Sequence, residues 1–392
     1  MTWATVPIGT VIRSSQYGLS LQADPDGHVP IVGMKDIQDG RVRIDPNVCV
    51  NLSEEDAQDY LLADGDILLN RTNSPDLVGK TGIYRGDGKA VFASYLVRLV
   101  LDRERVDPDY VIQILASEGG QRHIKQLATR AVSQANLNPT TFKSHFYIPL
   151  PRLGEQIAIR GVLLTWDTAI EKTQRLITAK NQRLSHLREH QLTKLNQSTR
   201  IKLKSAIRES TARNGKRLGR EAIMAVTKQV GLRPMREETI AAAIDRYKVV
   251  RPQAFAYNPM RLNIGSIAIS SFDDDVLVSP DYVVFECDEA KLLPGYLNHL
   301  RRTRHWASHF EAAGSGGVRI RIYYDDLGAF AFPLPSLAEQ QRVLSVLDAG
   351  VAEIETLEHY LAALQKQKRG LMQKLLTGQW RVPTNKGDSL DE

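Results

Sequence analysis

The sequence predicts an α+β fold in which two α/β globular domains are separated by two long helices that pack together as a coiled coil. The first observation is a repeat: the stretch Ile148–Gln156 (IPLPRLGEQ) returns 184 positions later as Phe332–Gln340 (FPLPSLAEQ). The second observation is that each stretch opens a run of apolar residues at heptad spacing, as in helices that wrap around each other. A period this long does not fit a solenoid and indicates a duplicated half-protein.

The repeat divides the chain into five consecutive parts. We expect a globular domain at 1–147, a long helix at 148–198, a second globular domain at 199–331, a second helix at 332–378 and a polar tail at 379–392. Each helix should run for about 40 residues, or roughly 60 Å. Two equal apolar seams bury each other most simply, so we expect the helices to pair.

The predicted seam follows steps of three and four residues along each helix. Its positions are Leu163, Trp166, Ile170, Thr173, Ile177, Lys180, Leu184, Leu187 and Gln191 in the first copy, and Val343, Leu347, Gly350, Ile354, Leu357, Leu361, Leu364, Lys368, Leu371 and Leu375 in the second. Ser336 and Glu339 form a predicted capping box at the second helix start, whereas Arg152 replaces the serine in the first. Gly378 is the expected C-terminal stop.

The first globular domain reads as mixed α/β. Alternating apolar residues predict strands at 29–34, 40–44, 67–69, 79–84 and 91–100, and a helical period covers 109–127. Landmarks of this domain return in the same order in the second one. The stretch 6–13 matches 201–208, 68–73 matches 255–261, 77–82 matches 262–267, 92–97 matches 277–284, and 107–111 matches 293–297.

Composition narrows the class of protein. A formal charge of +6 and a pI of about 9.1 are weak evidence for a nucleic-acid partner. We see no apolar run long enough to span a membrane and no signal peptide. Cys49 and Cys287 stand far apart without histidine spacing, which favours a reducing cytoplasm and argues against zinc.

Motifs for catalysis or metal binding are missing from the sequence. We find no Walker loop, GxGxxG, HExxH or paired-cysteine pattern, so we expect no catalytic residue and no metal site on this chain. The run Asp273–Asp275 is more typical of an acidic loop than of a metal site. His305 and His309 lie four residues apart but lack a third ligand.

Two diverged globular domains, each followed by a Pro-Leu-Pro-x-Leu-x-Glu-Gln helix, resemble the specificity subunit of type I restriction-modification systems. The resemblance spans nearly the whole chain and is strongest in the helices and in the stretches Tyr257–Ser266, Val278–Val283 and Ala313–Arg319. It implies two target-recognition domains, each reading one half of a split double-stranded DNA sequence. It further implies that the helices form an antiparallel coiled coil.

The resemblance also implies a set of partners. Two methyltransferase (M) subunits would dock on the helices and bind S-adenosylmethionine, so this chain would bind no cofactor itself. Separate motor-nuclease (R) subunits would cut the DNA. The first domain fits the family less closely, because Arg130–Gln134 stands where the second domain has its Gly-Ser-Gly-Gly phrase.

A DNA reader needs guanidinium and amide groups on loops, since arginine pairs with guanine and asparagine or glutamine with adenine. The candidates are Asn70, Arg71, Asn73, Arg130, Gln134 and Asn136 in the first domain, and Asn258, Arg261, Asn263, Arg319 and Arg321 in the second. The backbone amides of Gly314, Ser315, Gly316 and Gly317 are candidates for a phosphate contact, because glycine removes the Cβ obstacle. Such phrases are ordinary turns when taken alone, but their recurrence before the same helix favours DNA binding.

Some alternatives remain open at this point. The stretch Thr199–Arg220 carries eight basic residues against one acid, and it either adds sequence-independent DNA affinity or is a solvated linker. A self-contained restriction-methylation enzyme is a second possible function, disfavoured by the missing cofactor and nuclease motifs. A coiled-coil adaptor that binds protein alone is a third.

Overall fold

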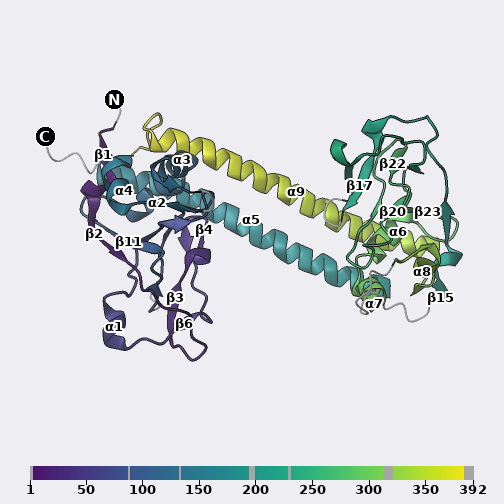
Figure 1. The fold of residues 1–392 in the computed structure, drawn as a ribbon, viewed down its shortest axis with the longest axis horizontal. Coiled ribbons are helices and arrows are strands. Elements are labelled where there is room, and N and C mark those ends of the chain that lie inside the picture. Colours follow the sequence, from purple (N-terminus) through teal and green to yellow (C-terminus); the bar gives the residue numbers. More distant parts are fainter. Residues whose placement is uncertain are drawn as a thin grey trace. The chain divides into compact units, whose positions relative to one another are not determined.

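The structure is a computed structural model that describes residues 3–86, 89–131, 134–193, 199–227, 231–312 and 321–383. The chain folds into two compact units (Figure 1). Unit 1 comprises Met1–Lys172 and Leu361–Glu392, and unit 2 comprises Thr173–Tyr360. Each unit therefore holds one predicted globular domain and part of both long helices. No helix in the described ranges is long and apolar enough to cross a bilayer.

Unit 1 is built on a six-stranded sheet whose order is β2-β11-β7-β9-β5-β4. The strands are β2 (Ile12–Tyr17), β11 (Leu96–Leu101), β7 (Ile67–Asn70), β9 (Thr81–Ile83), β5 (Arg41–Val42) and β4 (Ile37–Gln38). The pairs are antiparallel except β5 with β9. All four residues of β7 are buried, because this strand is central and covered on both faces.

Three helices cover this sheet (Figure 1), and each begins at a side-chain cap. They are α2 (Pro108–Ala116), α3 (Glu118–Leu127) and α4 (Pro139–His145), capped by Asp107, Ser117 and Asn138. The single helix expected at 109–127 is therefore wrong. Ser117 ends α2 with an extended backbone and caps α3 through a hydrogen bond from the Gly120 amide.

Smaller strands complete unit 1. One sheet has the order β10-β3-β6, from β10 (Val91–Phe92), β3 (Val29–Val32) and β6 (Cys49–Val50), beside the short helix α1 (Glu54–Gln58). Another has the order β12-β13-β8, from β12 (Thr129–Arg130), β13 (Ala135–Asn136) and β8 (Thr72–Asn73). The strand expected at 91–100 is split, because a turn at Ala93 separates β10 from β11. The pair β1 (Thr5–Pro7) and β14 (Tyr147–Pro149) leads into the first long helix.

Unit 2 repeats this plan with a four-stranded antiparallel sheet of order β16-β23-β20-β21. The strands are β16 (Ile207–Ser210), β23 (Val283–Cys287), β20 (Phe255–Tyr257) and β21 (Ile267–Ile269). The helices are α6 (Pro294–Leu300), α7 (Arg304–Ala312) and α8 (Tyr324–Gly328). Two further pairs form a lobe, namely β17 (Met224–Thr227) with β18 (Gly231–Pro234) and β19 (Lys248–Val250) with β22 (Val276–Val278).

The structure confirms the duplication. The order β16-β23-β20-β21 corresponds strand for strand to β2-β11-β7-β9, and β15 (Arg200–Lys202) pairs with β24 (Ala331–Pro333) as β1 pairs with β14. Each first strand leads into a 3-10 turn whose anchor, Ile8 or Leu203, is fully buried.

The two long helices are α5 (Leu153–Thr193, 41 residues) and α9 (Leu337–Leu376, 40 residues). Within unit 1, Nζ of Lys368 lies 2.6 Å from Oδ1 of Asp167. Within unit 2, Nζ of Lys180 lies 2.6 Å from Oε1 of Glu353. From Asp167 to Lys180 the residue number on α5 rises, while the number of the partner on α9 falls from Lys368 to Glu353. The two helices therefore pack antiparallel. Every predicted seam position is buried or half-buried and none is exposed, which confirms the seam.

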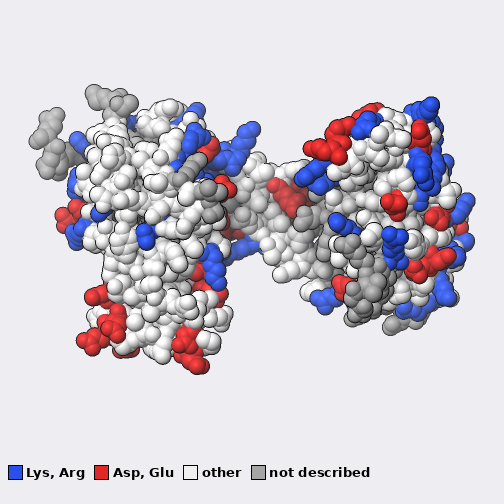
Figure 2. Space-filling view, viewed as in Figure 1, with Lys and Arg blue, Asp and Glu red and all other residues white. Residues whose placement is uncertain are grey.

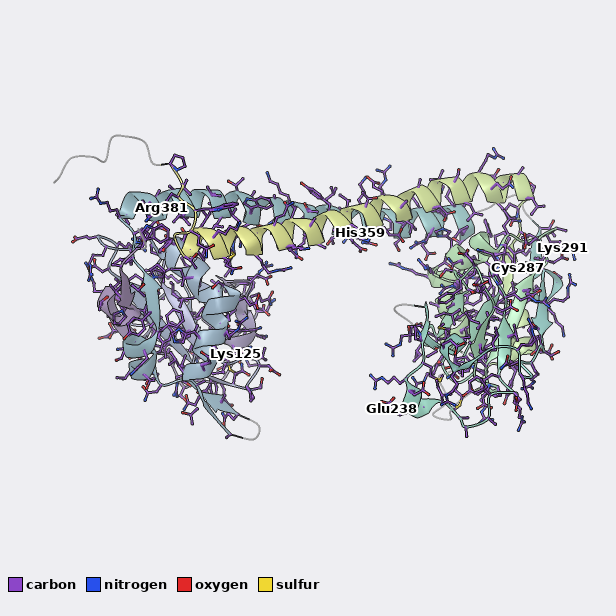
Figure 3. All side chains as sticks on the ribbon, turned by 90° about the horizontal axis from the view of Figure 1, so that it is seen from above. Lys125, Glu238, Cys287, Lys291, His359 and Arg381 are labelled. Carbon is purple, nitrogen blue, oxygen red and sulfur yellow. The ribbon has the colours of Figure 1, made fainter. Side chains whose placement is uncertain are left out.

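The repeated Glu-Gln phrase ties each helix start to its own globular part. Gln156 is fully buried; it accepts from the Asp107 amide (2.9 Å) and donates to the carbonyls of Arg105 (3.0 Å) and Pro151 (2.9 Å). Gln340 repeats this in unit 2: it accepts from the Leu293 amide (2.9 Å) and donates to the carbonyls of Lys291 (2.7 Å) and Pro335 (3.0 Å). Figure 3 labels Lys291 on unit 2. The two glutamines are therefore equivalent anchors.

A buried histidine joins α5, α6 and α9 inside unit 2. His299 is only 3 % exposed; its Nδ1 accepts from Nε of Arg188 at 3.1 Å, and its Nε2 lies 2.8 Å from Oδ1 of Asp348. Since a guanidinium can only donate, Nδ1 must be the acceptor and Nε2 carries the proton. Burial, the largest effect, lowers the pKa of His299, so the folded unit holds the neutral ring.

The helix ends agree in part with expectation. The Glu339 amide donates to Oγ of Ser336 at 3.3 Å, which is one half of the predicted capping box, while the Glu339 carboxylate pairs with Arg342. Gly378 has φ +74° two residues beyond the end of α9, which confirms the predicted stop.

Candidate nucleic-acid interface

In unit 1 the predicted DNA-binding residues come from two stretches, 70–73 and 130–136, and strands from both stretches pair in one small sheet. Strand β8 pairs with β13, which places Thr72 opposite Asn136 and Asn73 opposite Ala135. Strand β12 pairs with β13 on its other side, so Arg130 also lies opposite Ala135. Residues about sixty positions apart in the sequence thus share one surface, although the side chain of Arg130 lies outside the described part.

The side chains on this sheet differ in their exposure. Gln134 and Asn136 are exposed, and Oδ1 of Asn136 accepts from Oγ1 of Thr72 at 3.3 Å. Oδ1 of Asn73 accepts from the Ser74 amide at 2.8 Å, which leaves this half-buried residue partly occupied in its own turn. The exposed pair has amide groups free for further hydrogen bonds.

Asn70 lies apart from the exposed candidates. It ends the central strand β7, its side chain is 0 % exposed, and its Oδ1 and Nδ2 have no hydrogen-bond partner among the described residues. A base contact by Asn70 would require a local opening of the sheet, because the side chain does not reach the surface in this structure.

Arg71 contacts two tyrosines that the sequence analysis did not identify as candidates, Tyr17 and Tyr95. Its guanidinium carbon lies 5.0 Å from the ring centre of Tyr17, and its Nε donates to the Ser94 carbonyl at 3.4 Å. Tyr17 is 52 % exposed, and Tyr95, whose carbonyl accepts from the Arg71 amide, is 49 % exposed. Exposed tyrosine beside arginine and amides is a surface suited to stacking and hydrogen bonding with nucleic acid. Tyr95 lies within the stretch 92–97 that matches 277–284 in the second domain, so a signal for it was present.

In unit 2 two of the candidates line a hollow of about 490 Å³. Asn258 and Arg321 line it together with Lys248, Asp281 and Tyr323. Oδ1 of Asn258 accepts from the Met260 amide at 2.9 Å, and Nη1 of Arg321 donates to the Tyr323 hydroxyl at 3.3 Å. Burial lowers the pKa of Lys248. The hollow presents both donors and acceptors, as base edges do.

The two sites occupy corresponding places in the repeat. In unit 1 the Leu137 amide donates to the Arg71 carbonyl at 2.7 Å, and in unit 2 the Ile322 amide donates to the Pro259 carbonyl at 3.0 Å. Asn136 and Arg321 directly precede these donors, so an amide in one unit stands where a guanidinium stands in the other. This is the difference expected of two domains that read different bases.

The remaining candidates lie elsewhere or cannot be placed. Arg261 is exposed and Asn263 half-buried on the turn after Asn258, outside the hollow. Gly314, Ser315, Gly316, Gly317 and Arg319 lie outside the described residues. Within the described ranges, no three histidine, cysteine or acidic side chains are grouped so that they could hold a metal ion.

Comparison with known proteins shows which family this chain resembles. Residues 2–181 match the family model described as the type I restriction modification DNA specificity domain. A Methanocaldococcus jannaschii protein named as the specificity subunit of the type I restriction enzyme MjaX is 26 % identical over 411 residues, covering 97 % of this chain and 94 % of that one. Over nearly its whole length, this chain is therefore similar to type I restriction specificity subunits.

Two further relatives were found, one similar over less than half of the chain and one similar in fold over both units. The StySPI specificity subunit of Salmonella potsdam is 27 % identical over 176 residues, covering 43 % of this chain and 38 % of that one. The crystal structure of the type I S subunit from M. genitalium has a TM-score of 0.57 at 12 % identity, covering 95 % of this chain and 96 % of that one. The second likeness extends over both units and supports the shared fold.

Proposed function

We propose that this protein is a type I restriction specificity subunit that reads a bipartite double-stranded DNA target, with unit 1 reading one half-site and unit 2 the other. The observation that carries the proposal is that Asn136 in unit 1 and Arg321 in unit 2 occupy equivalent positions of a duplicated fold. One backbone plan thus presents two different sets of polar side chains. A protein that reads a single uniform site would not need this difference.

We further propose that the subunit has no catalytic activity of its own and acts as the scaffold for two M subunits. In this proposal the M subunits dock along α5 and α9, bind S-adenosylmethionine and transfer the methyl group, and R subunits join for cleavage. The complex would act in the cytoplasm on chromosomal DNA. Purified protein that transferred methyl groups from S-adenosylmethionine without an M subunit would contradict this.

A domain exchange tests the reading of half-sites. Replacing Thr2–Phe146 with the matching segment of a relative should change one half of the methylated motif and leave the other half unchanged. Replacing 203–330 should do the reverse. Methylome sequencing of the host provides the readout, with the unexchanged gene as control. A change in both halves after a single exchange would count against one domain per half-site.

A further inference from the structure

The basic stretch Thr199–Arg220 is a folded part of unit 2 and not a solvated linker. It contains β15, a 3-10 turn and β16, and then enters a tight turn at residues 213–218. The structure therefore removes the linker alternative for the described part of this stretch. What remains is the question of what its cations face.

A buried asparagine makes this turn rigid. Asn214 is 1 % exposed; its Nδ2 donates to the Leu218 carbonyl at 3.0 Å and its Oδ1 accepts from the Leu218 amide at 2.9 Å. Its backbone amide donates to the Tyr247 carbonyl at 2.8 Å. Gly215 follows with φ +59°, a conformation that glycine adopts without strain. These bonds fix the backbone from which the basic side chains of the turn extend.

The turn and its neighbour present a group of cations, which we call the basic turn: Arg213–Arg217 together with Arg246. Nη1 of Arg213 donates to the Arg246 carbonyl at 2.7 Å, which ties the Arg213 side chain to the backbone at Arg246. Arg217 is paired with Asp275 at 3.2 Å. Lys216 and Arg246 are exposed and make no side-chain hydrogen bond or ion pair with the described part of the chain. Their charges are therefore available to a partner.

The basic turn adjoins the hollow that holds Asn258 and Arg321. Arg213 forms an antiparallel β-bridge with Lys248, and the side chain of Lys248 lines that hollow. A duplex whose base edges enter the hollow would therefore carry its phosphates past the basic turn. Lysine and arginine that meet phosphates release counterions and add affinity for any sequence.

The corresponding stretch of unit 1 has the opposite charge. Between β2 and β3 the chain turns at Asp24–Gly27, where Oδ1 of Asp24 accepts from the Asp26 amide at 2.9 Å. The first turn of α1 adds Glu54, Glu55 and Asp56. Figure 2 shows acidic side chains gathered over this part of unit 1. An acidic surface repels phosphate, so this turn of unit 1 is not suited to bind the DNA backbone.

We propose that the basic turn of unit 2 binds the phosphate backbone beside the half-site that unit 2 reads, without reading sequence, and that the acidic turn of unit 1 makes no such contact. The proposal rests on the proposed DNA-reading function. It predicts that the sequence-independent part of the affinity is unequal between the two units, with a measurable share at Lys216 and Arg246.

The test is a salt titration of the double variant Lys216→Gln with Arg246→Gln, bound to its M subunit. Two duplexes of equal length are used, one carrying the methylated motif mapped in the host and one of random sequence. Losing two phosphate contacts should reduce the slope of log affinity against log salt by about 1.8. Between about 50 and 200 mM salt, the unmodified protein should then lose about 12-fold more affinity than the variant on both duplexes.

The matched control removes two exposed cations of unit 1 that lie between β3 and β6 in the sequence, Lys35→Gln with Arg43→Gln, and should leave the slope unchanged. Thermal unfolding confirms that each variant is folded. An unchanged slope for the Lys216 and Arg246 variant would overturn the proposal, and so would weakening confined to the motif duplex. If the unmodified protein did not prefer the motif duplex, the proposed function would fail, whereas the slopes would still decide the role of the basic turn.

Discussion

Replacing Gln340 with alanine is expected to loosen the attachment of α9 to unit 2 and to leave unit 1 intact. The side chain is fully buried and makes three hydrogen bonds to backbone groups of Leu293, Lys291 and Pro335. Alanine would remove all three partners at once. The groups left behind are one amide and two carbonyls, and buried groups of this kind are rarely unpaired in folded proteins.

The size of the effect follows from these bonds. Each hydrogen bond contributes about 1 kcal/mol net, so their loss should cost about 3 kcal/mol, without counting the cavity that the shorter side chain leaves. Because about 1.4 kcal/mol corresponds to a factor of ten, the open state of this junction should become roughly 100-fold more populated. The effect should be confined to unit 2, because the junction in unit 1 has its own anchor, Gln156.

Hydrogen exchange followed by mass spectrometry measures the two junctions separately. Peptides covering 288–296 and 335–345 should exchange faster in Gln340→Ala, while peptides covering 105–112 and 151–160 should be unaffected. Gln156→Ala should give the reverse pattern. The exposed neighbour Gln341 provides the matched control, because Gln341→Ala removes the same groups from the same helical turn. Equal effects of Gln340→Ala and Gln341→Ala would refute the anchoring role.

Three further predictions follow from the structure. Burial holds the pKa of His299 below its ordinary value of about 6.5, so unfolding takes up a proton below that pH; unit 2 should lose stability as pH falls through about 6.5, and His299→Gln should flatten this dependence in thermal unfolding. Arg321→Ala should cost about 1–3 kcal/mol and relax one position of the motif if the side chain meets a base, or weaken motif and scrambled duplexes alike if it meets a phosphate; unchanged titrations of both would remove it from the interface. Gly350 faces Leu184, its nearest contact, so inserting four residues after each of them should lengthen both helices by about 6 Å and widen the preferred gap between half-sites by one or two base pairs, with some loss of helix pairing from the stutter. A variant that folds, binds its M subunit and keeps the original gap would show that the helices do not set the spacing.

The sequence predicted best those features that repeat at a regular spacing. The heptad seam repeats over many turns, so it could be recognised although polar residues such as Lys180 and Lys368 interrupt it. In the structure each of these lysines pairs with an acid on the other helix, Glu353 or Asp167. Long-range pairing of this kind has no period and could not be predicted from spacing.

The candidate site was predicted less completely. The repeat singled out the stretches around Arg71 and Asn136, and the structure brings these two stretches onto one sheet. It could not show that Asn70 is buried, because a polar residue at the end of an apolar run looks like the start of an exposed loop. Tyr17 was missed because no strand was predicted at 12–17, so nothing in the sequence placed this residue beside Arg71. The contacts of all these residues with DNA remain predictions.

The division of the chain between its units has a consequence for synthesis. Unit 2 is continuous from Thr173 to Tyr360, whereas unit 1 needs the last turns of α9, whose Met372, Leu375 and Leu376 lie in its hydrophobic core. Domains are usually completed in the order in which the ribosome makes them. Here the core of the amino-terminal unit is completed only after the end of α9 has been synthesised, which is later than the whole of unit 2. Until then an apolar surface of α5 stays uncovered. A premature stop within 361–376 would therefore leave the carboxyl-terminal recognition unit whole and damage the amino-terminal one.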